Sequence, residues 1–179
     1  MTASALHLSP EDRDGLVQAL AALQTAEQCG HGWALAEAHL GLARCYSALG
    51  SLGLALSLLE KGLAWAQGVD QRVELLCDRI STLAQQSAQL EAERAGAGRS
   101  ARDAARDHIY ETSRLAGAVA DPRWEVKVLL HLSDVLDRFG DRDDAVNLQT
   151  RALRLMQHPG GESAIDPSQL VSLGRLADG

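Results

Sequence analysis

Apolar side chains recur at intervals of three and four residues through most of this chain. This spacing lines one face of an α-helix, and Leu129, Leu132 and Leu136 are a clear example. Only 3% of the residues are aromatic, so Ala and Leu must supply most of the buried surface. These two residue types suit closely packed helices better than sheets. The pattern therefore predicts an all-α fold.

Capping and turn residues divide this pattern into about eight helices. Ser9-Pro10 predicts the start of a first helix and Gly30 its end, because Ser caps, Pro fits the first helical position and Gly adopts a left-handed conformation. Three helical hairpins follow, with turns at Gly50-Ser51, Gly96-Ala97-Gly98 and Gly140-Asp141. The expected helices are 10–28, two within 33–67, 71–93, 100–119, two within 122–157, and a short one after Asp166-Pro167.

The first hairpin resembles a tetratricopeptide repeat (TPR), a family whose two helices meet through small residues. The matching positions are Leu42, Ala43, Tyr46, Leu49 and Gly50 in the first half and Ala55, Leu59 and Gly62 in the second. The third hairpin aligns with the first, since Phe139-Gly140 stands in the place of Leu49-Gly50. The chain is similar to TPR segments of bacterial signalling and regulatory proteins.

The middle hairpin departs from the family pattern. Gly50 and Gly140 lie 90 positions apart, more than twice the 34-residue period of the repeat. No glycine marks the turn expected near Ser87, and helix-forming residues continue through Glu93. We therefore expect an extended second repeat.

The resemblance implies a right-handed superhelix of about three hairpins with a flanking helix at each end. The whole chain, 1–179, would form one TPR-like domain. Its expected parts are an N-terminal capping helix (1–31), repeat 1 (32–68), extended repeat 2 (69–121), repeat 3 (122–158) and a C-terminal capping helix (163–179).

A TPR stack presents a concave groove lined by the first helix of each hairpin, and the resemblance implies that a peptide or partner helix binds there. The residues expected to line this groove are Glu37, Leu40, Arg44, Ser47, Asp78, Thr82, Gln85, Lys127, Leu130, Asp134 and Asp137. The alternative for any one of them is a helix face that is merely solvated. We expect Arg44→Glu to weaken partner binding with little change in stability.

One kind of partner is not expected in this groove. The co-chaperone TPRs that hold a C-terminal carboxylate need Lys and Asn at matched positions, where this chain has Leu40, Asp78 and Leu130. We therefore predict that this clamp is absent.

The charge balance narrows the class of partner. The formal net charge is −7, which would repel a phosphate backbone, so we expect no nucleic-acid partner. No uninterrupted apolar run could span a bilayer and no signal-peptide pattern opens the chain, so we expect a cytoplasmic protein that does not bind membranes. Five arginines between Arg94 and Arg114 alternate with carboxylates; they form either a salt-bridged helix face or a site for an acidic partner.

The sequence contains no recognisable catalytic or metal-binding motif. Three cysteines form no CxxC pair, and six histidines show no HExxH and no cluster at ligand spacing. Gly96-Ala97-Gly98 resembles the opening of a phosphate-binding loop, but no strand precedes it and the third glycine is missing. We expect no catalytic residue, no metal, no cofactor and no enzymatic activity.

The function expected from these observations is a protein–protein interaction module, an adaptor or scaffold that binds a peptide or helix in the TPR groove. One alternative is a regulatory or sensory segment of a larger bacterial signalling protein. Another is a self-associating structural module, since the uncovered apolar end of a helical repeat favours pairing into a homodimer.

Overall fold

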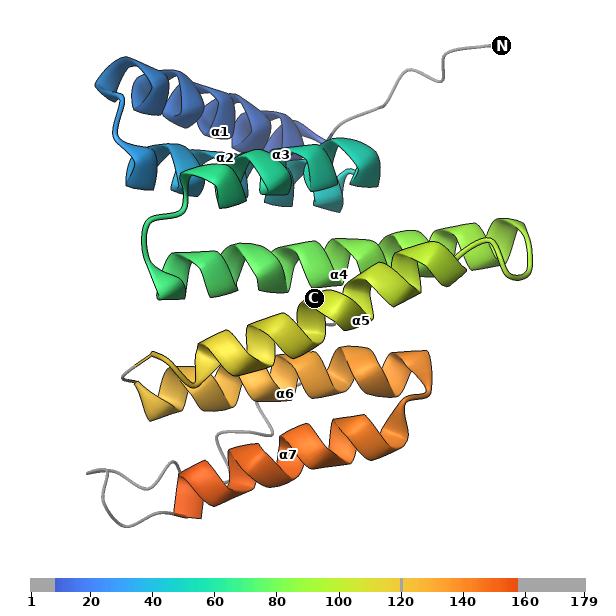
Figure 1. Cartoon of the computed structure of the whole chain (residues 1–179). Helices are drawn as coiled ribbons and strands as arrows, with labels where there is room; N and C mark the ends of the chain where they lie inside the picture. The colour runs from blue at the N-terminus through green and yellow to red at the C-terminus, as the bar shows by residue number, and fades with distance from the viewer. Residues whose placement is uncertain (1–8, 120, 158–179) are drawn as a thin grey trace. The chain divides into compact units, whose positions relative to one another are not determined.

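The computed structural model describes residues 9–119 and 121–157, and these residues form seven helices and no strand (Figure 1). The helices are α1 Pro10–Cys29, α2 Gly32–Ala48, α3 Leu52–Trp65, α4 Val69–Glu93, α5 Arg99–Ala116, α6 Pro122–Phe139 and α7 Arg142–Gln157. The predicted all-α fold is confirmed for this part of the chain. The C-terminal capping helix expected at 163–179 lies outside the described residues.

Ser9 and Gly30 cap α1 as the sequence predicts, and Asp121 caps α6 in the same way as Ser9. The Ser9 side chain accepts a hydrogen bond from the Asp12 amide at 3.1 Å, and Gly30 ends α1 with a φ of 68°. At α6, the Asp121 carboxylate accepts from the Arg123 amide at 2.9 Å. Local side-chain chemistry therefore fixes these helix ends.

The middle hairpin contains the longest helix. α4 runs for 25 residues and passes Ser87 without a break. Ser87 is buried, and its hydroxyl donates a hydrogen bond to the Gly98 carbonyl at 3.0 Å. The turn thus comes at Gly96-Ala97-Gly98, and α5 ends at Ala116, three residues before the predicted end.

The chain divides into two compact units, which are described separately here: unit 1 is residues 1–112 and unit 2 is residues 113–179. The boundary falls within α5 rather than between two of the predicted repeats. Among the described residues, no helix is long and apolar enough to cross a membrane.

The core of unit 1 is built from small residues where three helices meet. Six residues that are at most 1% exposed pack together there. They are Ala36, Leu40 and Ala43 of α2, Ala55 and Leu59 of α3, and Leu75 of α4. Small side chains at these positions let α2 and α3 approach closely.

Gly62 of α3 belongs to the same contact. A Cβ atom placed on Gly62 would lie 2.7 Å from Leu75 Cδ2 and 3.4 Å from His39 Cβ. Leu75 is fully buried, so its side chain has little space into which to move.

The first helix of unit 1 is much less buried. Leu23 and Ala26 of α1 pack with Leu35 and Ala38 of α2, and Ala26 is the only buried residue of α1. Leu20, which the sequence pattern places on the packing face with Leu16, Ala19 and Leu23, is 46% exposed.

Unit 2 has its own core between α6 and α7. Val126, Leu129 and Ala152 are buried there, with Leu148 and Leu155 packed against them. An ion pair with one buried partner, Glu125, joins the two helices, because Arg151 Nη2 lies 2.5 Å from a carboxylate oxygen of Glu125. Arg151 also donates to the Ser113 carbonyl at 3.1 Å, which ties the end of α5 to this pair.

Gly62→Ala should lower the free energy of unfolding, because strain from the added methyl exceeds the gain in helix propensity. We expect a net loss of about 1 kcal/mol, from a propensity gain of about 1 and an overpacking cost of roughly 1–3 kcal/mol. The measurement is urea denaturation followed by circular dichroism.

The matched control is Gly53→Ala in the same helix, where nothing lies within 4 Å of the added Cβ. This variant should be more stable than the wild type by up to about 1 kcal/mol. Equal stabilisation by both substitutions would contradict the close contact at Gly62.

Candidate functional site

A row of polar contacts joins α2 to α4 along one side of unit 1. At one end, Gln71 Nε2 donates to the Glu37 carboxylate at 2.9 Å and to the Trp33 carbonyl at 3.0 Å. At the other end, the Ser47 hydroxyl donates to Gln85 Oε1 at 3.1 Å. Two helices that are far apart in sequence are therefore held in a fixed register.

Arg44 makes the central and strongest contact of this row. Its Nε and Nη2 atoms donate to the two carboxylate oxygens of Asp78 at 3.1 and 2.8 Å, and Nη2 also donates to Glu74 at 2.9 Å. The bidentate hydrogen bond to Asp78 is the main reason that the pKa of Arg44 is raised above its ordinary value. About half of the Arg44 side chain is exposed.

We call this surface the α2–α4 face and define it by Glu37, Arg44 and Ser47 of α2 with Gln71, Glu74, Asp78 and Gln85 of α4. Glu37 and Gln71 are separated by 34 residues, as are Arg44 and Asp78. This separation equals the 34-residue period of the TPR pattern.

Two of the predicted groove residues lie beneath this face. Leu40 is 1% exposed and belongs to the core of unit 1. Thr82 is 2% exposed, and its hydroxyl donates to the Asp78 carbonyl at 2.8 Å. Neither side chain is available at the surface, because each points into the packing between helices.

Two other residues of the α2–α4 face were not predicted from the sequence. Gln71 is 3% exposed and Glu74 about half exposed in its side chain. A sequence signal for both existed: Gln71 lies 34 residues after Glu37, and Glu74 lies one helical turn before Asp78.

The remaining predicted site residues are on α6 in unit 2. Lys127 is exposed, Leu130 is half-buried against Val126 and Leu129, and Asp134 pairs with Arg138 at 2.6 Å. Asp137 lies 4.0 Å from Arg142. These four residues share one helix.

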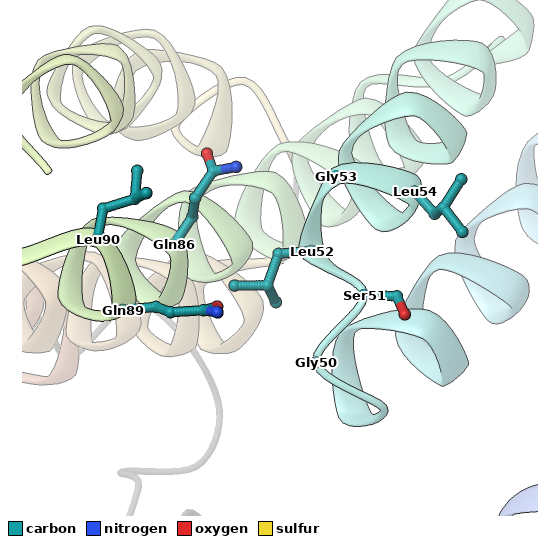
Figure 2. Close-up of a pocket in the computed structure, with 8 residues that line it drawn as sticks. All are labelled: Gly50, Ser51, Leu52, Gly53, Leu54, Gln86, Gln89 and Leu90. Carbon is teal, nitrogen blue, oxygen red and sulfur yellow. The ribbon is translucent and has the colours of Figure 1, made fainter. Parts of the chain in front are cut away.

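Unit 1 also contains a hollow beside the α2–α3 turn, with a volume of about 410 Å³. Figure 2 shows that the α3 side chain Leu52 points toward Gln89 of α4, whereas Leu54 points away from the α4 side chains. We call this space the turn hollow, lined by Gly50, Ser51, Leu52, Gly53, Leu54, Gln86, Gln89 and Leu90. Its wall combines leucine side chains with glutamine amides and backbone.

The α4–α5 loop binds one of the chain's own carboxylates. The amides of Gly96 and Gly98 donate to Glu91 at 2.9 and 3.3 Å, and these hydrogen bonds lower the pKa of Glu91. The loop that resembles a phosphate-binding sequence therefore already holds an anion, the Glu91 carboxylate. These amides stabilise the turn between α4 and α5.

The arginine-rich segment forms ion pairs within the chain. Arg106 donates to Asp103 at 3.1 Å on the same helix, and Glu111 accepts from Arg72 of α4 at 2.9 Å. Of the two alternatives for this segment, these contacts favour the salt-bridged helix face.

The described cysteines and histidines show no arrangement that favours reactivity. Burial raises the pKa of the Cys77 thiol to about 12, so it stays protonated at neutral pH. Burial also lowers the pKa values of His39 and His108. Within residues 9–119 and 121–157, no three His, Cys, Asp or Glu side chains come together to hold a metal ion.

Comparison with protein-family models finds no match for this chain, and a search of curated proteins finds no similar sequence. The TPR assignment therefore stays a prediction from the residues and their spacing.

Arg44→Glu should lower the stability of unit 1, contrary to our expectation from sequence alone. The substitution removes two ion pairs and places a third carboxylate beside Glu74 and Asp78. For such partly exposed pairs we expect a loss of about 1–2 kcal/mol, measured by urea denaturation. Salt should reduce the loss, because it screens the repulsion.

The control is the charge-swapped variant Arg44→Glu/Asp78→Arg, which restores a pair of opposite charges and should recover part of the loss. A swapped variant as unstable as the single one would mean that the Arg44–Asp78 pair contributes nothing measurable.

The hydrogen bonds to Glu91 should make the stability depend on pH. Because its folded pKa lies below the ordinary value of about 4.3, Glu91 contributes stability above pH 4.3 that is lost as the pH falls through the lowered pKa. The stability difference between wild type and Glu91→Gln should be largest near pH 7 and shrink in acid. Urea denaturation across this range measures it, and a constant difference would contradict the role of the carboxylate charge.

Proposed function

We propose that this chain is a protein-interaction module and that unit 1 binds a peptide segment of a partner protein along the α2–α4 face. In this proposal the hairpins are TPR-like repeats and the face is part of their groove. The observation that carries the proposal is the row of cross-helix contacts through Glu37, Arg44 and Ser47. These contacts hold polar groups in place before a ligand arrives, which reduces the entropy lost on binding.

The length of the face suits a short peptide. Asp78 and Gln89, which both reach the surface, lie 11 residues apart on α4, which is about three helical turns and roughly 16 Å. They therefore lie on the same side of α4, and an extended peptide of about five residues spans that distance.

The turn hollow gives this peptide an anchor. Leu52 and Leu90 offer apolar contact for one side chain, and the amides of Gln86 and Gln89 can bond to peptide backbone. Peptide binding commonly combines one buried anchor with polar contacts along the chain.

The charge of the face selects against acidic peptides. The face carries three carboxylates, on Glu37, Glu74 and Asp78, but one guanidinium, that of Arg44, which is already hydrogen bonded to Glu74 and Asp78. The partner segment should therefore be uncharged or basic, because an acidic one would be repelled.

The test is selection of a displayed random-peptide library on the full chain, followed by fluorescence anisotropy with the enriched peptides. Gln89→Arg places a long charged side chain at the edge of the turn hollow and should weaken binding at least about tenfold, equivalent to about 1.4 kcal/mol. Enriched peptides should also be poor in Asp and Glu.

The matched control is Gln149→Arg, the same substitution at an exposed position of α7 in unit 2. It should leave peptide affinity unchanged. Failure to enrich any peptide, or equal affinity of Gln89→Arg and wild type, would overturn the proposed site.

A further inference from the structure

The outer side of α1 carries apolar side chains that the described residues of unit 1 leave exposed. Of the 20 residues of α1, Ala26 alone is buried, while Val17 is 59% and Leu20 46% exposed. The packing of α1 within unit 1 is against α2. Most of the stability of a helix in a protein comes from tertiary packing of one face, so further burial of α1 would stabilise it.

Five of the exposed residues of α1 lie along one stripe of the helix. The intervals between them are alternately four and three residues, which is the spacing of residues at a helix–helix contact. The five residues are Arg13, Val17, Leu20, Gln24 and Glu27. All five are exposed. We call them the α1 stripe.

The charges of the α1 stripe lie at its ends and have opposite signs. No charged residue occurs from Gly15 to Ala26, so Arg13 and Glu27 flank an uncharged centre. The chain as a whole carries a net charge of −7, which opposes contact between copies over most surfaces. The centre of the stripe is free of that repulsion.

We propose that the α1 stripe pairs with the same stripe of a second copy of this chain, with the two helices antiparallel. A two-fold axis near Leu20 places the leucines of the two copies against each other. It also brings Arg13 of each copy alongside Glu27 of the other. A parallel pair would instead bring like charges together at both ends, so the charge pattern selects the antiparallel arrangement.

The size of the surface determines how strong this dimer is. α1 is about 30 Å long, and one helix face offers less than the roughly 800 Å² per partner of a standard interface. The dimer is therefore weak and reversible, and it forms at high protein concentration. It uses a different surface from the peptide site on α2 and α4, so either can fail without the other.

The experiment is sedimentation equilibrium of the full chain over a range of concentrations up to about 1 mM, where weak association becomes visible. The wild-type average mass should rise from the monomer toward the dimer value. Leu20→Glu places two carboxylates at the two-fold axis and should weaken association at least about tenfold. The control Val146→Glu, at a 56% exposed position on α7, should behave as the wild type.

Charge reversal tests the orientation. Arg13→Glu should weaken the dimer roughly threefold to thirtyfold, because two exposed ion pairs become two repulsions, and Arg13→Glu/Glu27→Arg should restore it. In a parallel dimer the single reversal would change little. Circular dichroism verifies that each variant is folded.

Three results would overturn the proposal: a wild type that stays monomeric throughout, association that Leu20→Glu does not weaken, or no recovery in the double charge reversal.

Discussion

Close approach of α2, α3 and α4 is the constraint on which unit 1 depends. Ala43, Ala55 and Gly62 have no bulk to hold these helices apart, so the backbones come near enough for Leu75 to fill the contact completely. The spacing of the helices then decides which polar side chains can meet at the surface. The Arg44 contacts are thus a consequence of small residues one layer below, and a larger side chain in that layer would separate the polar partners as well.

Local signals made most of the helices predictable. The helix ends depend on hydrogen bonds and backbone conformations that involve only near neighbours in sequence, as at Ser9, Gly30, Asp121 and Gly140. Sequence analysis therefore locates these helix ends well. The long α4 was predictable for the same reason, because nothing near Ser87 could end it. The partial exposure of α1 was not predictable, because an apolar stripe in the sequence does not determine whether another helix covers it.

The site was less predictable than the fold because it depends on contacts between helices. Helical spacing placed Arg44 and Asp78 on outward faces, and the structure brings them together. The same spacing also selected Leu40 and Thr82, which are buried, because a difference of one position around a helix decides between surface and core. Sequence spacing alone cannot resolve that difference where small residues allow helices to pack closely.

The length of α4 has a consequence for how such a surface can change during evolution. The contact between Ser47 and Gln85 comes near the end of α2, yet α4 continues to Glu93. The extra turns build one wall of the turn hollow, and the Glu91 loop closes the hairpin beyond it. Lengthening one hairpin along its axis therefore adds a hollow to the surface while the α2–α3–α4 core stays the same. A helical protein built this way can gain new surface by extending helices that it already has, without gaining another helix.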